Sequence, residues 1–348
     1  MELSGRTVIG LSMYNLPTSE ARNLVRELSG QLTSYWTTQS IFVCVDLRLP
    51  DLIASGVNTL DKLEQTIDIP VSRVKILIRA MKSLGMISLS DPIQLTAKGQ
   101  LLTSDHPWSM LPATYVWCLE HYQTWSQITS AVLSGKEQFS TVYGLPFFTW
   151  LQQNPEMAEY YYRAMHIYAL TDYIEFPEFI PITEGERVVD VGCGLGSLLR
   201  IIQDHYPKAE YIGIDLSLPI QLARREGNEK ITFSEVDFFD DDLPKADVFL
   251  LSRIIHDWND SKATEILVNC MKRLKTGGRI IVMERCLNPD LNEDWGALLD
   301  LNMLIITGGI ERTRREYMNL FHSAGLQLKG ENYIDESKIT VFTLEREP

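Results

Sequence analysis

Residues 187–197 read RVVDVGCGLGS, a short apolar run followed at once by three alternating glycines. The run has the length and the β-branched composition of a buried strand. Gly192, Gly194 and Gly196 permit a tight turn in which the backbone approaches a ligand closely, and the helical pattern after them would place a helix N-terminus behind that turn. Their spacing is G-x-G-x-G and not G-x-G-x-x-G, so the loop alone is a weak indication of a dinucleotide site.

Further apolar runs alternate with helical patterns between residues 187 and 287. The runs read EYIGIDL, ITFSEVDF, DVFLLS and RIIVMER, and one helical pattern, DSKATEILVNCMKRLKTGG, should be capped by Asp260 and Ser261 and stop at Gly277-Gly278. Strands joined by crossover helices predict an α/β fold with a doubly wound, mostly parallel sheet. The C-terminal sequence LQLKGENYIDESKITVFTLERE predicts two more strands, which would form an antiparallel edge.

The N-terminal part has a different pattern. Residues 31–105 combine amphipathic helical patterns with two short extended runs around Asp91-Pro92, as in a winged helix-turn-helix domain. Residues 57–110 contain six Lys or Arg against five Asp or Glu, and the whole chain carries a net charge of -14, which repels a phosphate backbone. We therefore predict that residues 1–105 form a packing or dimerisation domain and do not bind nucleic acid.

Length and composition are those of a globular chain with about two domains. The 348 residues are 45% hydrophobic and 22% charged, and the five cysteines are scattered without a C-x-x-C pair. Reduced thiols are therefore expected in place of disulfides or a zinc site. No apolar run approaches the ~20 residues that a bilayer span needs, and the N-terminal sequence lacks a secretory signal, so we predict a cytoplasmic protein without membrane contact.

Polar side chains follow the predicted strands at their carboxyl ends, where open α/β sheets bind ligands. Asp215 is placed to accept hydrogen bonds from both hydroxyls of a ribose, and Asp237 with Phe238 could bind the amine and cover the ring of an adenine. Because these polar residues follow consecutive strands, a ligand that contains a nucleoside explains them better than separate helix caps would. His256 and Glu284 follow the next two strands, which favours a neutral imidazole acting as general base, held in one tautomer by a carboxylate on the neighbouring strand.

A metal site is not predicted at this edge of the sheet. No second histidine lies at ligand spacing from His256, and the nearest acid, Asp257, is expected to face a different direction.

In their order and spacing, DVGCGLG, GIDL, DFF, HDWND, GGRIIVMER and TGGIERT resemble the S-adenosylmethionine-dependent O-methyltransferases of the plant caffeate and acetylserotonin type and their bacterial small-molecule relatives. The resemblance implies a Rossmann-like cofactor domain over residues 181–348 and an N-terminal winged-helix domain that forms a homodimer. It makes His256 the catalytic base, framed by Glu284 and Glu311. Ser252 occupies the place where many members have lysine or arginine, and Arg253 follows it, which leaves two candidates for that contact. The implied cofactor residues are Gly192, Gly194, Asp215, Leu216, Asp237, Phe238, Ser252 and Arg253.

The acceptor is predicted to be a small aromatic molecule with a phenolic hydroxyl. Residues 106–180 are helical and rich in aromatic side chains, which suits a lid over a flat ligand. The expected substrate wall consists of Met165, His166, Asp257, Asn302 and Met303. Methylation of nitrogen or carbon, use of the cofactor without methyl transfer, and a DNA-binding regulator remain the alternatives. Because aromatic walls accept many flat molecules, the sequence predicts the class of the acceptor and not its identity.

Overall fold

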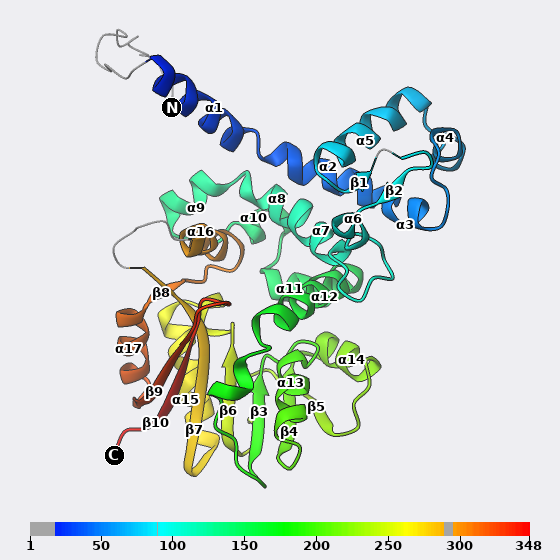
Figure 1. The fold of residues 1–348 in the computed structure, drawn as a ribbon. Coiled ribbons are helices and arrows are strands. Elements are labelled where there is room, and N and C mark those ends of the chain that lie inside the picture. Colours follow the sequence, from blue (N-terminus) through cyan, green and yellow to red (C-terminus); the bar gives the residue numbers. More distant parts are fainter. Residues whose placement is uncertain (1–17, 89, 289–294) are drawn as a thin grey trace. The chain divides into compact units, whose positions relative to one another are not determined.

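The computed structural model describes residues 18–88, 90–288 and 295–348 and divides the chain into two units, Met1–Gln100 and Leu101–Pro348 (Figure 1). The helical segment 106–180 belongs to the second unit, together with the sheet. No helix in the described residues is long and apolar enough to cross a membrane.

The first unit is mainly helical and ends in a small two-stranded sheet. Helix α5 buries Val74, Ile78 and Met81, which share one face at helical spacing. Strands β1 and β2 pair antiparallel, which confirms the two extended runs predicted around Asp91-Pro92. The elements are α1 (Thr18–Leu32), α2 (Tyr35–Asp46), α3 (Leu49–Ala54), α4 (Leu60–Ile67), α5 (Val71–Ser83), β1 (Ile87–Ser88), β2 (Gln94–Leu95) and α6 (Ala97–Gln100).

The second unit begins with helices rich in aromatic residues. Phe139, Phe147 and Leu151 are buried in a cluster that also contains Ile305 and Ile306 of helix α16, so this late helix packs with the early ones. The elements are α7 (Leu111–Cys118), α8 (Glu120–Trp125), α9 (Ile128–Ser134), α10 (Phe139–Tyr143), α11 (Phe147–Gln153), α12 (Pro155–Asp172), the 3-10 helix η1 (Phe176–Phe179) and, later in the chain, α16 (Trp295–Ile306).

An eight-stranded sheet forms the centre of the second unit. Along the sheet the order is β5-β4-β3-β6-β7-β10-β9, with β8 paired to β7 off this path. The pairs from β5 to β7 are parallel and β10 is antiparallel to both neighbours, which confirms the predicted fold and its antiparallel edge. The strands are β3 (Arg187–Val191), β4 (Glu210–Asp215), β5 (Ile231–Glu235), β6 (Ala246–Ser252), β7 (Leu274–Leu287), β8 (Arg312–Thr313), β9 (Leu326–Ile334) and β10 (Ile339–Arg346).

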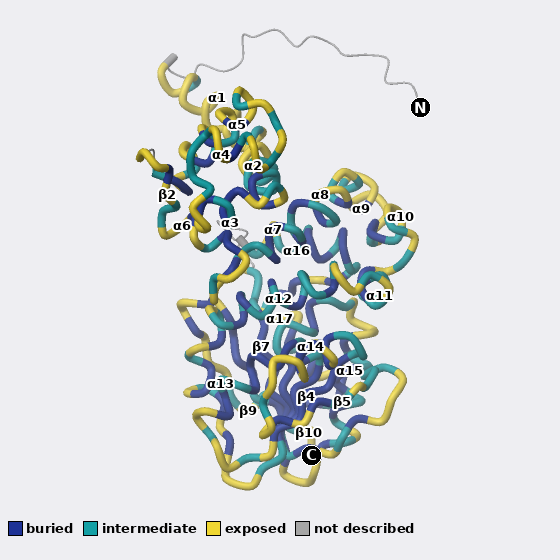
Figure 2. The backbone as a smooth tube through the Cα atoms, turned by 90° about the vertical axis from the view of Figure 1, so that its right-hand side faces the viewer, coloured by how far each residue is buried: buried dark blue, intermediate teal, exposed yellow. Residues whose placement is uncertain are grey.

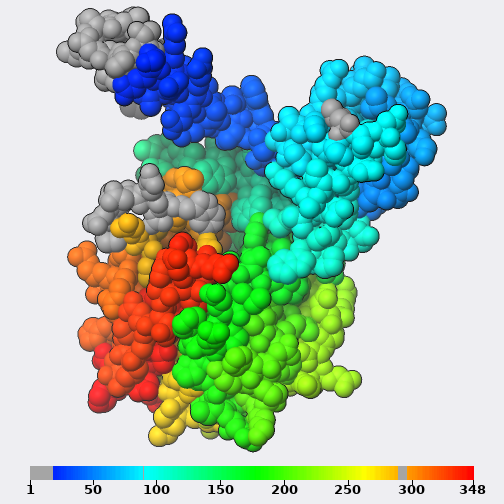
Figure 3. All heavy atoms as spheres, viewed as in Figure 1, coloured from blue at the N-terminus to red at the C-terminus, as the bar shows by residue number. Residues whose placement is uncertain are grey.

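Helices cover both faces of this sheet. Alternate residues of each strand face opposite sides, so Val188 lies in one core cluster and Val189 in the other. Side chains of α13 (Ser197–His205) and α14 (Ser217–Arg225) join the first cluster, and those of α15 (Asp260–Arg273) and α17 (Arg314–Ser323) join the second. The strands are accordingly buried in Figure 2. Ile334 and Ile339 at the β9–β10 turn pack in one core cluster with Phe176 of η1. On the surface of the same unit, red atoms of the C-terminal segment lie beside green atoms in Figure 3.

Two predicted boundaries around α15 are wrong. The N-cap is Asn259, whose side chain accepts a hydrogen bond from the Lys262 N–H, and not Asp260 or Ser261. The helix ends at Arg273, four residues before Gly277, because Leu274 is buried in the core and already pairs with Ala246 of β6. Packing of one apolar side chain therefore ends the helix before the glycine signal does.

Candidate active site

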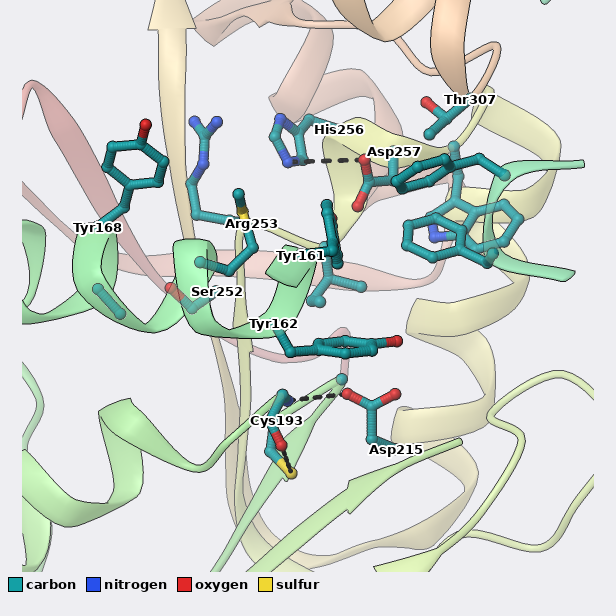
Figure 4. A pocket seen from close by; sticks show the side chains of 18 of the residues that line it. Tyr161, Tyr162, Tyr168, Cys193, Asp215, Ser252, Arg253, His256, Asp257 and Thr307 are labelled. Atoms are coloured by element: carbon teal, nitrogen blue, oxygen red, sulfur yellow. Dashed lines mark hydrogen bonds and ion pairs between the residues drawn. The ribbon is translucent and has the colours of Figure 1, made fainter. Parts of the chain in front are cut away.

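A cavity of about 910 Å³ lies at the carboxyl edge of the parallel strands. Asp190, Asp215 and Ser252 line it from the ends of β3, β4 and β6, and further lining comes from the loops after these strands and from helices α7, α8, α11, α12 and α16. Figure 4 shows part of this lining, with Cys193 and Asp215 at one end and Arg253 and His256 at the other. The cavity thus has two ends of different chemistry.

The glycine loop forms the first end. Gly192, Gly194 and Gly196 all have left-handed backbones, with φ of 72°, 54° and 75°, which confirms the predicted tight turn. A Cβ on Gly192 would lie 2.5 Å from the terminal methyl of Ile254, so a larger residue would have to displace that side chain and also adopt a strained left-handed backbone. The loop therefore keeps its backbone close to the space where a ligand would lie.

Asp215 fixes this loop from the end of β4. Its two carboxylate oxygens accept hydrogen bonds from the N–H groups of Gly194, at 2.8 Å, and Leu216, at 2.7 Å. Burial raises the pKa of Asp215 to about 6, although both backbone hydrogen bonds act in the opposite direction. Each carboxylate oxygen has a second lone pair, so the residue retains capacity for the ribose hydroxyls expected from the sequence.

The remaining predicted cofactor residues also line the cavity. Asp237 accepts a hydrogen bond from the Phe239 N–H at 2.9 Å, and Phe238 lies next to Trp258, with ring centroids 6.1 Å apart. Leu216, Ser252 and Arg253 complete the set on the cavity wall. The structure therefore brings all eight predicted residues to one cavity, and the local hydrogen-bond acceptors and the aromatic ring suit an adenosine-containing cofactor.

His256 stands at the second end, in the 3-10 helix η2 (Ile255–Asp257) that follows β6. Its Nδ1 lies 2.6 Å from Oε1 of Glu311, where it donates a hydrogen bond, because an ionised carboxylate can only accept. Both residues are buried, with exposed fractions of 5% and 2%. The ring is therefore held in the tautomer that leaves Nε2 without a proton.

The expectation that a carboxylate on the neighbouring strand holds this ring is wrong. Glu284 of β7 instead accepts hydrogen bonds from the backbone N–H groups of Ile255, at 2.9 Å, and His256, at 3.3 Å. These two N–H groups begin a short helix and have no partner within it, which explains why the carboxylate binds there. Glu284 positions the backbone of the loop, and Glu311 positions the imidazole.

Charges around His256 act on its pKa in both directions. Burial lowers the pKa and so does the Arg253 guanidinium, but Glu284, Glu311 and Asp257 outweigh them and raise it above its ordinary value. Burial raises the pKa of Asp257 to about 6. Asp257 lies 3.9 Å from His256 Nε2, so the prediction that it faces a different direction is wrong. The Asp257 carboxyl is thus held near Nε2, the ring nitrogen that does not contact Glu311.

This group of residues does not suit a metal ion. His256, Glu284 and Glu311 bring possible ligand atoms within 4.8 Å of one another. However, His256 Nδ1 already donates to Glu311, and a nitrogen of Arg253 lies 3.7 Å from the same oxygen. A metal ion would have to displace the contacts that His256 and Arg253 make with Glu311, so we assign no metal ion to these residues.

Two residues near Glu311 contact the η2 segment that carries His256, and neither was singled out from the sequence. Gly309 lies so close to η2 that a Cβ would come within 2.2 Å of the His256 carbonyl oxygen. Arg312 is 1% exposed and donates to the carbonyls of Ile255, Trp258 and Ile310 and to the carboxylate of Asp260, at 2.8–3.1 Å. Both belong to the motif TGGIERT, so the glycine and the arginine of that motif could have indicated these contacts from the sequence.

The five predicted substrate residues all line the cavity, but not at one end. His166 Nδ1 lies 2.6 Å from Oγ of Ser197, the residue directly after the glycine loop, so His166 belongs to the first end. Asn302 accepts a hydrogen bond from the Trp125 indole at 2.9 Å, which ties α16 to α8. Aromatic lining residues that were not predicted individually from the sequence are Trp117, Phe147, Phe148, Tyr161, Tyr162, Tyr168, Tyr173, Phe239 and Trp258.

Comparisons with known proteins agree with this geometry. A family model of the O-methyltransferase domain matches residues 125–327. The phenazine O-methyltransferase PhzM of Lysobacter antibioticus is 29% identical over 311 residues, which cover 86% of this chain and 89% of the relative. The 3-amino-4-hydroxybenzoate 4-O-methyltransferase of Streptomyces cremeus is 28% identical over 341 residues, which cover 95% and 92%. The solved structure of LaPhzM has a TM-score of 0.85 at 27% identity and covers 95% of this chain and 100% of its own.

Other matches bear on the cofactor and on the range of chemistry. The structure of PigF with S-adenosylhomocysteine has a TM-score of 0.84 at 25% identity and covers 95% of this chain and 100% of its own. A phenazine-1-carboxylate N-methyltransferase of Pseudomonas aeruginosa is 25% identical over 324 residues, which cover 91% and 95%. The resemblance found in the sequence is confirmed. Because the matched domain spans most of the unit Leu101–Pro348, the chain belongs to the O-methyltransferase domain family and is an S-adenosylmethionine-dependent methyltransferase.

Proposed function

We propose that this enzyme methylates a phenolic hydroxyl of a small aromatic acceptor and that His256 is the general base. The observation that carries the proposal is the 2.6 Å contact between His256 Nδ1 and Glu311, which leaves Nε2 as the basic atom of a cavity-lining imidazole. A phenol with a pKa of ~10 is mostly protonated at neutral pH, so a positioned base accelerates its reaction. Relatives named for hydroxylated aromatic substrates support this acceptor class.

S-adenosylmethionine, when bound, supplies an electrophilic methyl group. Asp215 would bind the ribose, Asp237 and Phe238 the adenine, and the glycine loop would approach the amino-acid part. His256 Nε2 accepts the phenolic proton as the acceptor oxygen becomes nucleophilic, and Glu311 stabilises the resulting imidazolium. The helices over the cavity exclude water and hold the acceptor in line, and such positioning can contribute ~7–11 kcal/mol.

Methylation of nitrogen is the alternative, because one of the relatives is named an N-methyltransferase. A nitrogen heterocycle already has a free lone pair and needs no base. The buried His256–Glu311 pair would then have no role in the reaction, which is why we favour oxygen.

The acceptor atom can be tested with matched compounds. We expect methyl transfer from labelled S-adenosylmethionine to naphthols or hydroxylated phenazines, and no transfer to the same ring systems when the hydroxyl is replaced by an amine or absent. Mass spectrometry of the products locates the methyl group. Transfer to the ring nitrogen of an unhydroxylated phenazine at a comparable rate would contradict the proposal.

We also propose that the enzyme is a homodimer in the cytoplasm. Leu24, Leu28 and Leu32 follow one another at four-residue spacing on α1 and are 47%, 55% and 69% exposed, and Trp36 of α2 is 60% exposed. An apolar stripe of this kind is typical of a surface that a second subunit covers. The five free cysteines suit a reducing compartment.

Sedimentation equilibrium checks the assembly. We expect a dimer that persists at micromolar concentration, as large apolar interfaces do, and a shift toward monomer when Leu24 and Leu28 are both replaced by Asp. Replacing Ile174, which is 68% exposed in the second unit, by Asp is the matched control. A monomeric native protein under these conditions would contradict the proposed dimer.

A further inference from the structure

Arg253 has an unusual backbone and an unusual environment for an arginine. It directly follows β6 with φ of 59°, a left-handed conformation that L residues other than glycine seldom adopt and that clusters at functional sites. Its N–H donates to the Met283 carbonyl of β7 at 3.0 Å, which fixes this backbone. Nitrogen Nη1 is buried and has no hydrogen-bond partner among the described residues. The strained turn therefore holds a guanidinium inside the cavity wall.

The guanidinium lies with the catalytic histidine and away from the glycine loop. Arg253 Nη2 is 3.7 Å from the same Glu311 oxygen that accepts the His256 hydrogen bond at 2.6 Å. In Figure 4 its side chain extends away from Cys193 and Asp215 and reaches the level of the imidazole. One carboxylate oxygen is thus shared by two cationic partners.

We propose that Arg253 is a positioning residue for the base: it shares the Glu311 carboxylate with the imidazole and so keeps His256 available in the neutral form that accepts a proton. The inference rests on the proposed role of His256 as base. It assigns to Arg253 an action on Glu311, whereas the sequence left Ser252 and Arg253 as two candidates for a contact with the cofactor.

The charges that face His256 explain why such a residue is needed. Three acids surround the ring: Asp257 on η2, Glu284 on β7 and Glu311 in the segment before β8, and all three favour the imidazolium. Arg253 opposes them from the end of β6. On the other elements, Arg285 of β7 is paired with Asp172 at 3.2 Å, and the Tyr317 hydroxyl of α17 lies near both glutamates.

An imidazolium cannot take a proton from the phenolic substrate. If no cation opposed the three acids, His256 would be protonated at neutral pH and could not act as a base. A cation close to an acid offsets its effect on a neighbouring group, typically by one or more pKa units when the charges lie within ~4–6 Å. Without Arg253, the pKa of His256 should therefore rise further and the neutral fraction should fall.

Arg253→Met tests this, because methionine keeps a long apolar side chain and removes the charge. We expect the His256 pKa to rise by about 1 unit, measured by NMR on protein labelled with ¹³C at the histidine Cε1 position. The acidic limb of kcat/KM should move to higher pH by the same amount, so that activity lost at pH 7 returns near pH 9. Arg253→Lys should keep most of the wild-type behaviour, and S-adenosylhomocysteine affinity should change by less than about twofold.

His256→Gln assigns the His256 signal among the six histidines of the chain. The control is Arg314→Met, which removes an arginine paired with Glu331 on the surface, outside the cavity, and should shift neither the signal nor the rate profile. An unchanged His256 pKa in Arg253→Met would overturn the inference, and a tenfold loss of S-adenosylhomocysteine affinity with it would make Arg253 a cofactor contact. A raised pKa with an unshifted rate profile would support the coupling to Arg253 and overturn His256 as the base.

Discussion

His256→Ala should lower turnover on a phenolic acceptor by about 10²–10⁴-fold, the contribution typical of a positioned general base. S-adenosylhomocysteine affinity, measured by calorimetry, should stay within about twofold, because the glycine loop and Asp215, which are expected to bind the cofactor, lie at the other end of the cavity. The variant would therefore lose methyl transfer and keep cofactor binding. The contrast is informative because a histidine with a merely structural role would weaken both together.

The loss in His256→Ala should shrink as the assay pH approaches ~10, where the phenol ionises without help. In the wild type, the neutral imidazole must be present, and the acids around it raise its pKa, so activity should fall as pH drops through a value above the ordinary ~6.5. His322→Ala is the control, since His322 is exposed and pairs with Glu347 on the surface. A variant without pH rescue, or one that also loses thermal stability and cofactor binding, would show that His256 is not the base.

Glu311→Gln should lower turnover by about 10²-fold with little change in cofactor affinity. The carboxylate accepts the Nδ1–H hydrogen bond and so fixes the tautomer, whereas an amide can donate to Nδ1 and favour the unreactive one. Loss of the negative charge should also lower the His256 pKa and move the acidic limb of the rate profile to lower pH, the opposite of the shift expected for Arg253→Met. Steady-state kinetics across pH measures both effects.

Glu331→Gln provides the control for this substitution. Glu331 pairs with Arg314 on the surface, where an ion pair contributes little, and its loss should leave turnover unchanged. The melting temperature of Glu311→Gln should be recorded, because a buried acid is replaced. A folded Glu311→Gln variant with turnover within about threefold of wild type would contradict the role given to Glu311.

Much of the fold was predictable because local signals and packing agree in the sheet. The apolar runs of β3, β4 and β6 are buried on both faces, so their composition alone identifies them as strands. Residues 192, 194 and 196 adopt backbone conformations that only glycine adopts readily, so the turn could be predicted from a single sequence. The end of α15 was missed because Leu274 packs into the sheet, a tertiary effect with no local signal.

The site was predictable in its members more than in its connections. His256, Glu284 and Glu311 meet although they are distant in the chain, and which carboxylate binds the ring depends on backbone N–H groups left free by η2. The aromatic wall was only partly found. Tyr161, Met165, Tyr168 and Asp172 recur every three or four residues on α12 and line the cavity together, a periodicity that could have separated the wall from the rest of the helix.

The two halves of the cavity come from different parts of the chain. The groups proposed to handle the proton and the cofactor stand at strand ends and around residues 309–312, whereas Trp117, His121, Phe147, Phe148 and Gln152 reach in from α7, α8 and α11. Mutations in these helices can reshape the space for the acceptor while the strand ends stay in place. The architecture therefore lets a lineage diversify in what it modifies while its reaction stays constant, and it marks α7, α8 and α11 as the segments to randomise in directed evolution.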